Sequence, residues 1–361
     1  MVTSLRFVIL TIALWAGQII AAPECHGPGN HGPQRPCKHK LKRKAWHTFT
    51  RKEKKAYIDA DLCLMGLPAT LGFPGAKNRF EELQWTHQVQ ASIIHSVGAF
   101  LPFHRLLMHA HEKILREECG YKGAQPYWDE ARDAGNFVGS VVLDPVTGFG
   151  GTGVGEDNCV EDGPFAGYVN GLGPGYKVGD NCLYRDVNDT LSAMAAREYI
   201  DWCYKKDNFV DFWRCAELAP HNGGHAGVGG KMLDPIASPG DPIFYLHHTW
   251  LDKVFWEWQA LDLPARLKDI GGENLPQRSG PPTGNFPPDG SGLPMPLPNL
   301  DAFPPLDAWT PLPGSPAQIP EGDPGSETTL THILNMWGVI ANATIADVMD
   351  IGGPLLCYEY V

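Results

Sequence analysis

The histidines of this chain are concentrated in two short windows. Of 14 histidines, five lie within residues 87–111 and four within residues 221–248. Imidazole is a common ligand of transition metals, so the fold must either bring these windows to metal sites or bury them by chance in a core. No cysteine stands beside either window, and imidazole sets of this kind suit copper, zinc or iron.

The second window contains a spacing typical of metal sites. His221 and His225 stand four residues apart, so on a helix both imidazoles would lie on one face. Asn222 occupies the position at which a zinc protease with this spacing carries its catalytic glutamate. The pair His247-His248 follows, and adjacent residues on a helix point about 100° apart. We therefore expect only one of the pair to join the same metal.

The first window is interrupted by helix-breaking residues. His87, His95 and His104 are separated by eight and nine positions, with Gly98 and Pro102 between the last two. Such a break would let three imidazoles converge from two helices and a loop. A single straight helix would not allow it.

Composition and charge restrict the class of protein. The 361 residues are 43% hydrophobic and 19% charged, which is enough apolar mass for a large core in one or two domains. The net charge of −12 disfavours nucleic-acid binding. Beyond the N-terminus no apolar run reaches the roughly 18 residues of a membrane span.

The N-terminus has the pattern of a signal peptide over residues 1–22, which predicts a secreted protein. It has a positive charge at Arg6, an apolar stretch at 7–14, and the small residues Ala21 and Ala22 at the expected cleavage site.

Nine cysteines in a secreted chain should mostly pair and leave at least one over. Their connectivity does not follow from one sequence. The sequons at Asn188 and Asn342 are compatible with surface glycosylation.

Local patterns predict a mainly helical chain. Thr50 and Glu53 form a capping box before a helix from Arg51 to about Met65. Asn78 marks the start of a second helix. This second helix should run to about Ile94, and further helical segments are expected over residues 103–118, 190–206 and 242–258. Residues 129–190 are expected to form long disulfide-stapled loops, residues 271–325 a proline-rich irregular wrap, and residues 328–349 a final patterned segment.

The stretch from Arg35 to Lys55 carries ten basic residues against one acidic residue, Glu53. A solvated arm leading into a helix is favoured here over an anion-binding patch. Lys42-Arg43 is also a candidate dibasic processing site.

Two segments resemble the signatures of a known family. His95 and His104-Arg105, with Leu-Pro-Phe before the second histidine, resemble the copper A signature of the tyrosinase and catechol oxidase family. Residues 241–252, Asp-Pro-Ile-Phe-Tyr-Leu-His-His-Thr-Trp-Leu-Asp, match its copper B signature closely. The resemblance covers roughly residues 45–260 and is strongest to short secreted fungal polyphenol oxidases.

The resemblance implies two copper ions in a four-helix bundle wrapped by loops. The copper ligands it implies are His87, His95 and His104 for copper A, and His221, His225 and His248 for copper B. His248 is chosen within its pair because it stands four residues before Asp252, so His247 should point elsewhere. The domain arrangement then expected is a basic arm at 23–44, a copper-binding domain at 45–265, and a wrap with a C-terminal segment at 266–361 that packs on that domain.

Three positions depart from the family pattern. Phe103 replaces the usual Trp, and His111 stands where the family carries an aromatic residue, so we expect His111 to support the site rather than bind metal as a seventh ligand. Many members link a cysteine covalently to the middle copper A histidine. Here Ile93 occupies the usual cysteine position, which leaves only Cys63 as a remote candidate.

The function implied is oxidation of phenols to o-quinones with dioxygen by a secreted monomer that binds neither nucleic acid nor membrane. Glu217 and Asn222 match the positions at which plant-type members hold a water that can accept a phenol proton. Ala226 is small and should leave room above copper B, so we expect monophenol hydroxylation as well as diphenol oxidation. The alternatives are an oxygen-binding protein without turnover and a secreted zinc hydrolase.

Overall fold

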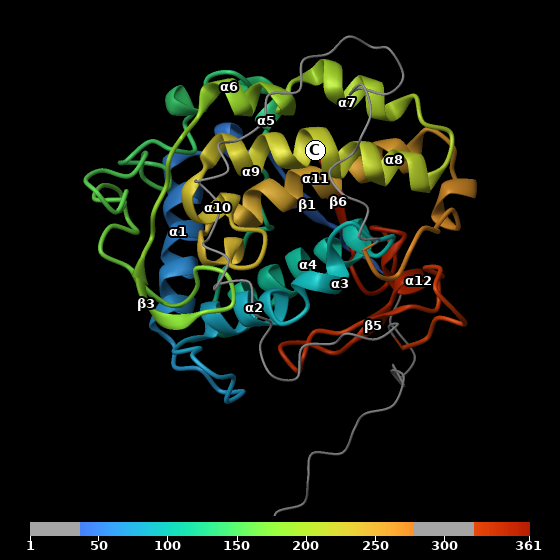
Figure 1. The fold of residues 1–361 in the computed structure, drawn as a ribbon, viewed down its shortest axis with the longest axis horizontal. Coiled ribbons are helices and arrows are strands. Elements are labelled where there is room, and N and C mark those ends of the chain that lie inside the picture. Colours follow the sequence, from blue (N-terminus) through green and yellow to red (C-terminus); the bar gives the residue numbers. More distant parts are fainter. Residues whose placement is uncertain (1–36, 277–320) are drawn as a thin grey trace, which may run out of the picture.

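The computed structural model describes residues 37–276 and 321–361, and helices dominate it (Figure 1). The longer helices are α1 (Arg51–Gly66), α2 (Arg79–Gln88), α4 (Phe100–Glu118), α7 (Arg197–Tyr204), α8 (Phe209–Ala216), α9 (Asn222–Val228) and α11 (Ile243–Ala260). The one-turn helices are α3 (Ala91–Ile94), α5 (Glu130–Asp133), α6 (Asp189–Ser192), α10 (Gly230–Leu233) and α12 (Ile345–Val348). The expectation of a mainly α fold is confirmed.

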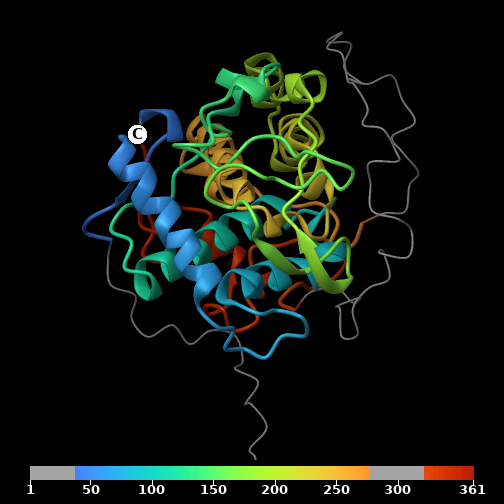
Figure 2. The same ribbon diagram turned by 90° about the vertical axis from the view of Figure 1, so that its left-hand side faces the viewer.

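Four helices, α2, α4, α9 and α11, form the centre of the molecule (Figure 1). The sequence of α11 is apolar and aromatic almost all round, which is the pattern of a helix buried on every side, and its residues from Ile243 to Asp252 are all buried. The α2 helix is likewise buried along its whole length. Around this centre, α1 crosses one side of the bundle (Figure 2).

The helix starts follow from capping chemistry. Thr50 and Glu53 make the expected reciprocal capping box of α1, and the Asn78 side chain caps α2. The α2 helix ends at Gln88 instead of continuing to Ile94, because the chain turns before the separate helix α3. Pro102 does not break a helix: it lies in the first turn of α4, where a missing N–H costs nothing.

Three short strand pairs complete the part of the fold that the structure describes. They are the parallel pair β1 (Leu41–Arg43) with β6 (Tyr358–Tyr360), the antiparallel pair β2 (Val169–Leu172) with β3 (Val178–Cys182), and the antiparallel pair β4 (Ile333–Leu334) with β5 (Ala343–Thr344). The patterned segment 328–349 therefore contains two short strands and α12. The β1–β6 pair places the C-terminus beside the start of the described chain (Figure 2).

Eight cysteines form four disulfides, which confirms the prediction that most of the nine would pair. The bonds are Cys37–Cys357, Cys63–Cys119, Cys159–Cys182 and Cys203–Cys215. The ninth, Cys25, lies outside the described residues, as do the signal-peptide segment and residues 277–320 of the proline-rich stretch. Because Cys63 is bonded to Cys119, it is not available to link covalently to a histidine.

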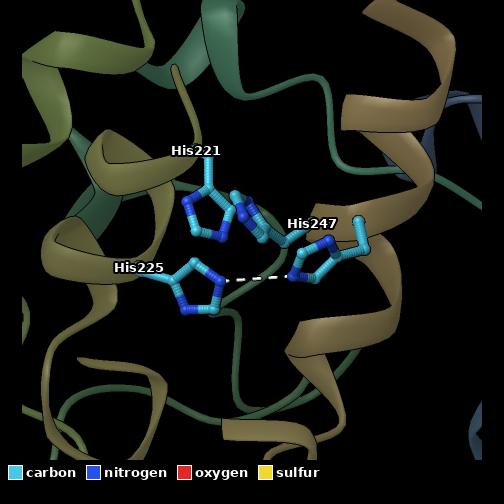
Figure 3. Close-up of side chains that lie close together, drawn as sticks. His221, His225 and His247 are labelled. Carbon is cyan, nitrogen blue, oxygen red and sulfur yellow. Dashed lines mark hydrogen bonds between the residues drawn. The ribbon is translucent and has the colours of Figure 1, made fainter. Parts of the chain in front are cut away.

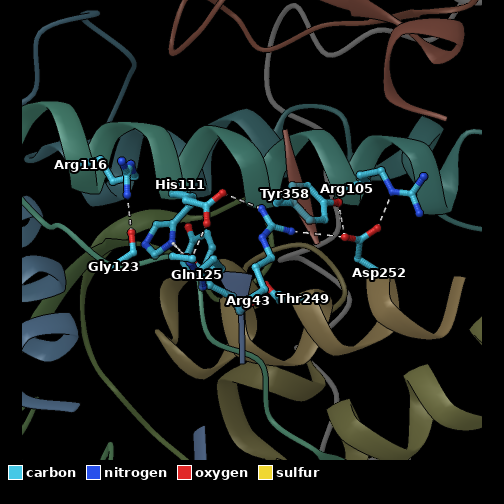
Figure 4. Close-up of polar contacts among 12 residues, drawn as sticks. Arg43, Arg105, His111, Arg116, Gly123, Gln125, Thr249, Asp252 and Tyr358 are labelled. Carbon is cyan, nitrogen blue, oxygen red and sulfur yellow. Dashed lines mark hydrogen bonds and ion pairs between the residues drawn. The ribbon is translucent and has the colours of Figure 1, made fainter. Parts of the chain in front are cut away.

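Arg43 is an exception to the prediction that residues 35–55 form a solvated arm, and its burial argues against the candidate processing site at Lys42-Arg43. Its side chain is fully buried, pairs with Glu112 at 2.9 Å and with Asp252 at 3.3 Å, and stacks on the ring of Tyr358 (Figure 4). Asp252 also pairs with Arg105 of α4. A guanidinium buried among these partners is not accessible to a protease in the folded protein.

Among the described helices, none is both long and apolar enough to cross a membrane.

Candidate metal centre

The first histidine cluster (His87, His95 and His104) forms where three segments meet. His87 comes from the end of α2, His95 directly follows α3, and His104 lies in the first turns of α4. The ring centroids are 5.0, 5.4 and 5.3 Å apart, and one nitrogen of each ring lies within 4.8 Å of one nitrogen of the others. The break expected between the last two histidines is therefore real, and it lets the three imidazoles converge.

The second histidine cluster (His221, His225, His247 and His248) joins α9 and its preceding turn to α11. Pro220 lacks an N–H, and the helix around it widens into the π-helical turn η4 (Glu217–His221). This turn leads directly into α9, so His221 and His225 project toward α11 (Figure 3). Nε2 of His225 lies 3.3 Å from Nε2 of His248. That is about the separation of two nitrogens bound roughly 2.0 Å from one tetrahedral metal ion.

Hydrogen bonds fix which ring nitrogen faces each cluster. In five rings Nδ1 is bonded to a main-chain carbonyl oxygen: His87 to Ile236 at 3.0 Å, His95 to Ala91 at 3.0 Å, His104 to Phe100 at 2.8 Å, His221 to Glu217 at 3.2 Å, and His225 to Met232. A carbonyl can only accept, so Nδ1 carries the proton and Nε2 carries the lone pair. Nε2 of His87, His104 and His221 is buried without a hydrogen-bond partner, which is the form a metal ligand requires.

Burial keeps these imidazoles neutral. It lowers the pKa of His87, His104, His221, His225 and His248 well below 6.5, with a smaller contribution from neighbouring histidines, and lowers the pKa of His95 to about 4. Neutral imidazole is the metal-binding form. The residues present therefore fit transition-metal ions at both clusters.

The two clusters lie next to each other and share aromatic neighbours. The rings of His104 and His248 stack at 4.1 Å between centroids. Phe244 packs 4.2 Å from His248 and 5.4 Å from His87, while Phe100 packs 4.9 Å from His104 and 4.8 Å from His221. These phenyl rings surround the histidines with apolar surface.

The expectation that His247 points elsewhere is wrong. A nitrogen of His247 belongs to the second histidine cluster, and its ring lies 4.5 Å from that of His225 (Figure 3). Its Nδ1 bonds to the Glu130 carboxylate at 2.7 Å. Sequence reasoning missed Glu130, because nothing local marks a glutamate whose partner is 117 residues away.

Glu217 links the two clusters. Its half-buried carboxylate accepts the backbone N–H of Ser96 at 2.8 Å, and Ser96 directly follows His95. Burial raises the pKa of Glu217 to about 8, against the opposing effect of the Ser96 N–H. Asn222 begins α9 with an exposed side chain, and Ala226 is buried.

His111 is not placed to bind a metal. Its Nε2 bonds to Asp61 at 2.9 Å, its Nδ1 bonds to Gln125 at 3.0 Å, and its ring stacks on Tyr245 at 3.8 Å (Figure 4). With both nitrogens occupied, it ties α1 and α4 together in the core. The expectation that it is not a seventh ligand agrees with this geometry.

Comparison with known proteins gives the class of the site. Residues 77–261 match the model of the common central domain of tyrosinase. That domain, together with the two facing histidine clusters, implies a type-3 copper site.

Similar proteins cover nearly the whole chain. Tyrosinase ustQ of Aspergillus flavus is 34% identical over 90% of this chain and 80% of its own length. Tyrosinase-like protein phomQ1' of Diaporthe leptostromiformis is 28% identical over 93% of this chain and 83% of its own. The structure of a polyphenol oxidase from Thermothelomyces thermophila (mutant G292N) is 25% identical, covers 89% of both chains and superimposes with a TM-score of 0.71. The chain belongs to the tyrosinase family.

Proposed function

We propose that this protein is a secreted polyphenol oxidase that holds two copper ions and oxidises o-diphenols, and hydroxylates monophenols, to o-quinones with dioxygen. One copper ion would be held by His87, His95 and His104, and the other by His221, His225 and His248. The observation that carries the proposal is the pair of facing clusters, in which one nitrogen of each ring lies within 4.8 Å of the others and Nε2 of His87, His104 and His221 is buried without a hydrogen-bond partner. Bound copper would supply dioxygen binding and two-electron oxidation.

The protein's own contribution begins with how it holds the ligands. Main-chain carbonyls fix the tautomer and orientation of five of the six imidazoles before any metal binds. Phe100 and Phe244 exclude water from the sides of the clusters. Such a site binds copper without reorganising the helices.

Glu217 is the group we assign to the monophenol proton. A monophenol has a pKa near 10, so it must lose its proton to a base before it can act as a ligand. The N–H of Ser96, the residue after His95, orients the Glu217 carboxylate, and the main-chain oxygen of Glu217 is bonded to Nδ1 of His221. A pKa of about 8 makes it a stronger base than an ordinary glutamate, while nearby copper charge would lower that value. Asn222, at the start of α9, would help to hold the water that carries the proton.

Oxygen uptake over a panel of monophenols and diphenols, with metal analysis of the same sample, tests the proposal. We expect about two copper ions per chain and uptake with both substrate classes. Copper binding without turnover would favour an oxygen-binding protein. Zinc with no copper after aerobic reconstitution would remove the oxidase proposal.

Glu217→Gln tests the proton step. It should depress monophenol hydroxylation far more than diphenol oxidation, because only the monophenol needs a base. Glu273→Gln is the control, since Glu273 is a nearby carboxylate paired with Arg214. Equal loss of both activities in Glu217→Gln would show that this carboxylate is structural.

Secretion is supported by the four disulfides, which persist in oxidising compartments. Thiol titration of the unfolded, unreduced protein should find about one free thiol, from the ninth cysteine, Cys25. Five or more free thiols would contradict the secretion proposal.

A further inference from the structure

The basic stretch before and at the start of α1 has no part in the proposed copper function. Its charge pattern favoured a solvated arm over an anion-binding patch. In the structure, residues 40–44 of this stretch, residues 52–60 of α1 and the loop 119–124 after α4 line a hollow of about 950 Å³. Both β1 and α1 lie on this side of the molecule (Figure 2).

Three lysines line the hollow from β1 and its flanking residues. Lys40, Lys42 and Lys44 occupy alternate positions, and alternate side chains of an extended strand point to the same side. Arg43 is fully buried on the opposite side. Alternate residues of a strand are roughly 6.6 Å apart, so the three side chains leave β1 at regular intervals. Lys42 pairs with Glu359 at 4.0 Å, but both side chains are exposed and the contact is weak.

Two further lysines line the other walls of the hollow. Lys52 comes from the first turn of α1, and Lys122 comes from the loop 119–124. Both are exposed, and neither has an ion pair with any residue that the structure describes. Their ammonium groups are therefore available to an anion from solvent.

The two carboxylates that line the hollow are already paired with lysines. Glu53 pairs with Lys44 at 2.9 Å, and Asp59 pairs with Lys55 at 2.7 Å. The lining therefore keeps an excess of positive charge, although the whole chain carries a net charge of −12. A local positive surface on an acidic protein indicates an anionic partner.

The walls of the hollow are fixed before any partner binds. The strand β1 is held by its pairing with β6 and by the Cys37–Cys357 disulfide. The loop 119–124 is held by the Cys63–Cys119 disulfide and by Arg116, whose Nη1 donates to a main-chain oxygen of the loop at 2.5 Å. A preformed groove spares its partner the cost of ordering the protein.

The lining favours a carboxylate-bearing polysaccharide over a nucleic acid. Its cations are all lysines, which act as point charges, whereas arginine is preferred for bidentate recognition of phosphate. Single strands of nucleic acid also stack on exposed aromatic rings, but the aromatic residues of this lining, Phe49 and Tyr121, are only 9% and 6% exposed. A polymer of acidic sugars needs neither feature, because its spaced carboxylates can pair with spaced ammonium groups.

We propose that this hollow, which we call the lysine groove, binds an acidic polysaccharide whose sugars carry carboxylate groups. The lysines of the groove are Lys40, Lys42, Lys44, Lys52 and Lys122. The proposed secretion would bring the protein to such polymers. Binding would hold the oxidase on an acidic polymer while small phenols diffuse to it.

The lysine groove is separate from the histidine clusters. Cys119 of the groove stands 15 residues after His104, which places them about 22 Å apart along α4 and its end. No histidine of either cluster lines the groove. A bound polymer therefore leaves the clusters open, and the binding does not depend on copper.

Binding of the full chain to polygalacturonate tests the proposal. Wild type should bind this polymer but not neutral dextran, and its affinity should fall as salt rises from about 0.05 to 0.2 M. The double variant Lys52→Gln/Lys122→Gln should bind about 10–30-fold more weakly, since one lysine near an anionic surface contributes about fivefold. Its rate of diphenol oxidation should equal that of wild type, which also shows that the variant is folded.

Lys205→Gln/Lys268→Gln is the matched control. It removes the same charge from two exposed lysines outside the groove, so its affinity for polygalacturonate should equal that of wild type. An equal loss in both double variants would show that only net charge matters and would overturn the proposal.

Three further outcomes decide the identity of the partner. Failure of wild type to bind polygalacturonate at low salt would refute the lysine groove as its site. Equally tight binding of single-stranded DNA of matched charge would contradict the assignment to a polysaccharide. Retained polygalacturonate binding in a copper-loaded protein that oxidises no phenol would refute the proposed function and leave the groove proposal standing.

Discussion

Asp252 holds together four elements that are far apart in the sequence. The Asp252 side chain is 1% exposed. Its carboxylate forms ion pairs with Arg43 of β1 and Arg105 of α4, and it accepts hydrogen bonds from the hydroxyl groups of Tyr358 and Tyr360 of β6. Asp252→Asn keeps the shape and removes the charge. We predict a loss of folding stability with the metal site retained, because this carboxylate is turned toward the arginines and tyrosines.

The size of the stability loss depends on which partners Arg43 and Arg105 keep in Asp252→Asn. Arg43 retains Glu112 at 2.9 Å, so its charge remains paired. Among the described residues, Arg105 has Asp252 as its only carboxylate, but it keeps the main-chain oxygens of Val348 and Met349 at 3.0 and 3.1 Å. Breaking a buried pair by removing one partner costs about 3–5 kcal/mol. The neutral acceptors left to Arg105 place the expected loss near the lower end, about 3 kcal/mol.

Denaturant unfolding of the disulfide-intact protein at fixed copper content measures this loss. Asp59→Asn is the control, because Asp59 forms an exposed i,i+4 pair with Lys55, and its loss should change stability by no more than about 0.5 kcal/mol. A loss below about 1 kcal/mol in Asp252→Asn would refute the reasoning. So would release of copper without any loss of stability.

Two further predictions concern the cap of α1 and the longest disulfide loop. Thr50→Ala should lower the free energy of unfolding by about 1 kcal/mol through loss of the cap. The backbone N–H of Thr50, and secondarily Lys44, lower the pKa of Glu53 to about 2. Its stabilising effect is therefore present above about pH 4.5 and lost as pH falls toward 2, so the stability difference between wild type and Glu53→Gln should close over that range in denaturant titrations. Replacing both cysteines of the Cys37–Cys357 bond by serine opens a loop of 320 residues, and chain entropy predicts that the free energy of unfolding falls by roughly 5–6 kcal/mol. The same argument predicts roughly 3 kcal/mol for the Cys203–Cys215 bond, whose cysteines are 12 residues apart. A smaller loss for Cys37–Cys357 than for Cys203–Cys215 in denaturant unfolding would contradict this estimate.

The features that the sequence could predict are those whose cause is local. The capping box of α1 needs only Thr50 and Glu53, which are three residues apart, and it appears as expected. The separation of His221 and His225 by one helical turn likewise brings both rings to one side. The number of paired cysteines followed from composition, but their connectivity depends on packing that no local pattern contains.

The errors arose where partners are distant. The charge pattern of residues 35–55 indicated a solvated arm, and nothing in it distinguishes Arg43, whose partners Glu112 and Asp252 lie 69 and 209 residues away. His247 was expected to point away because an ideal helix separates adjacent side chains widely. The structure instead brings His221 from the widened turn η4 and His225 from α9 against α11, where they meet both of its histidines.

The pairing of β1 with β6 has a consequence for how the chain is made. Cys37 and Cys357 are 320 residues apart, so at about 5–20 residues per second the ribosome completes the partner roughly 15–60 s after the first cysteine. During that interval Cys37 is open to pairing with the wrong thiol, and Arg43 does not yet have β6 beside it. A nascent chain stopped five residues early would already contain every histidine of both clusters, yet it would lack β6 and Cys357. Premature termination there would remove the element that secures the N-terminal strand rather than a loose tail.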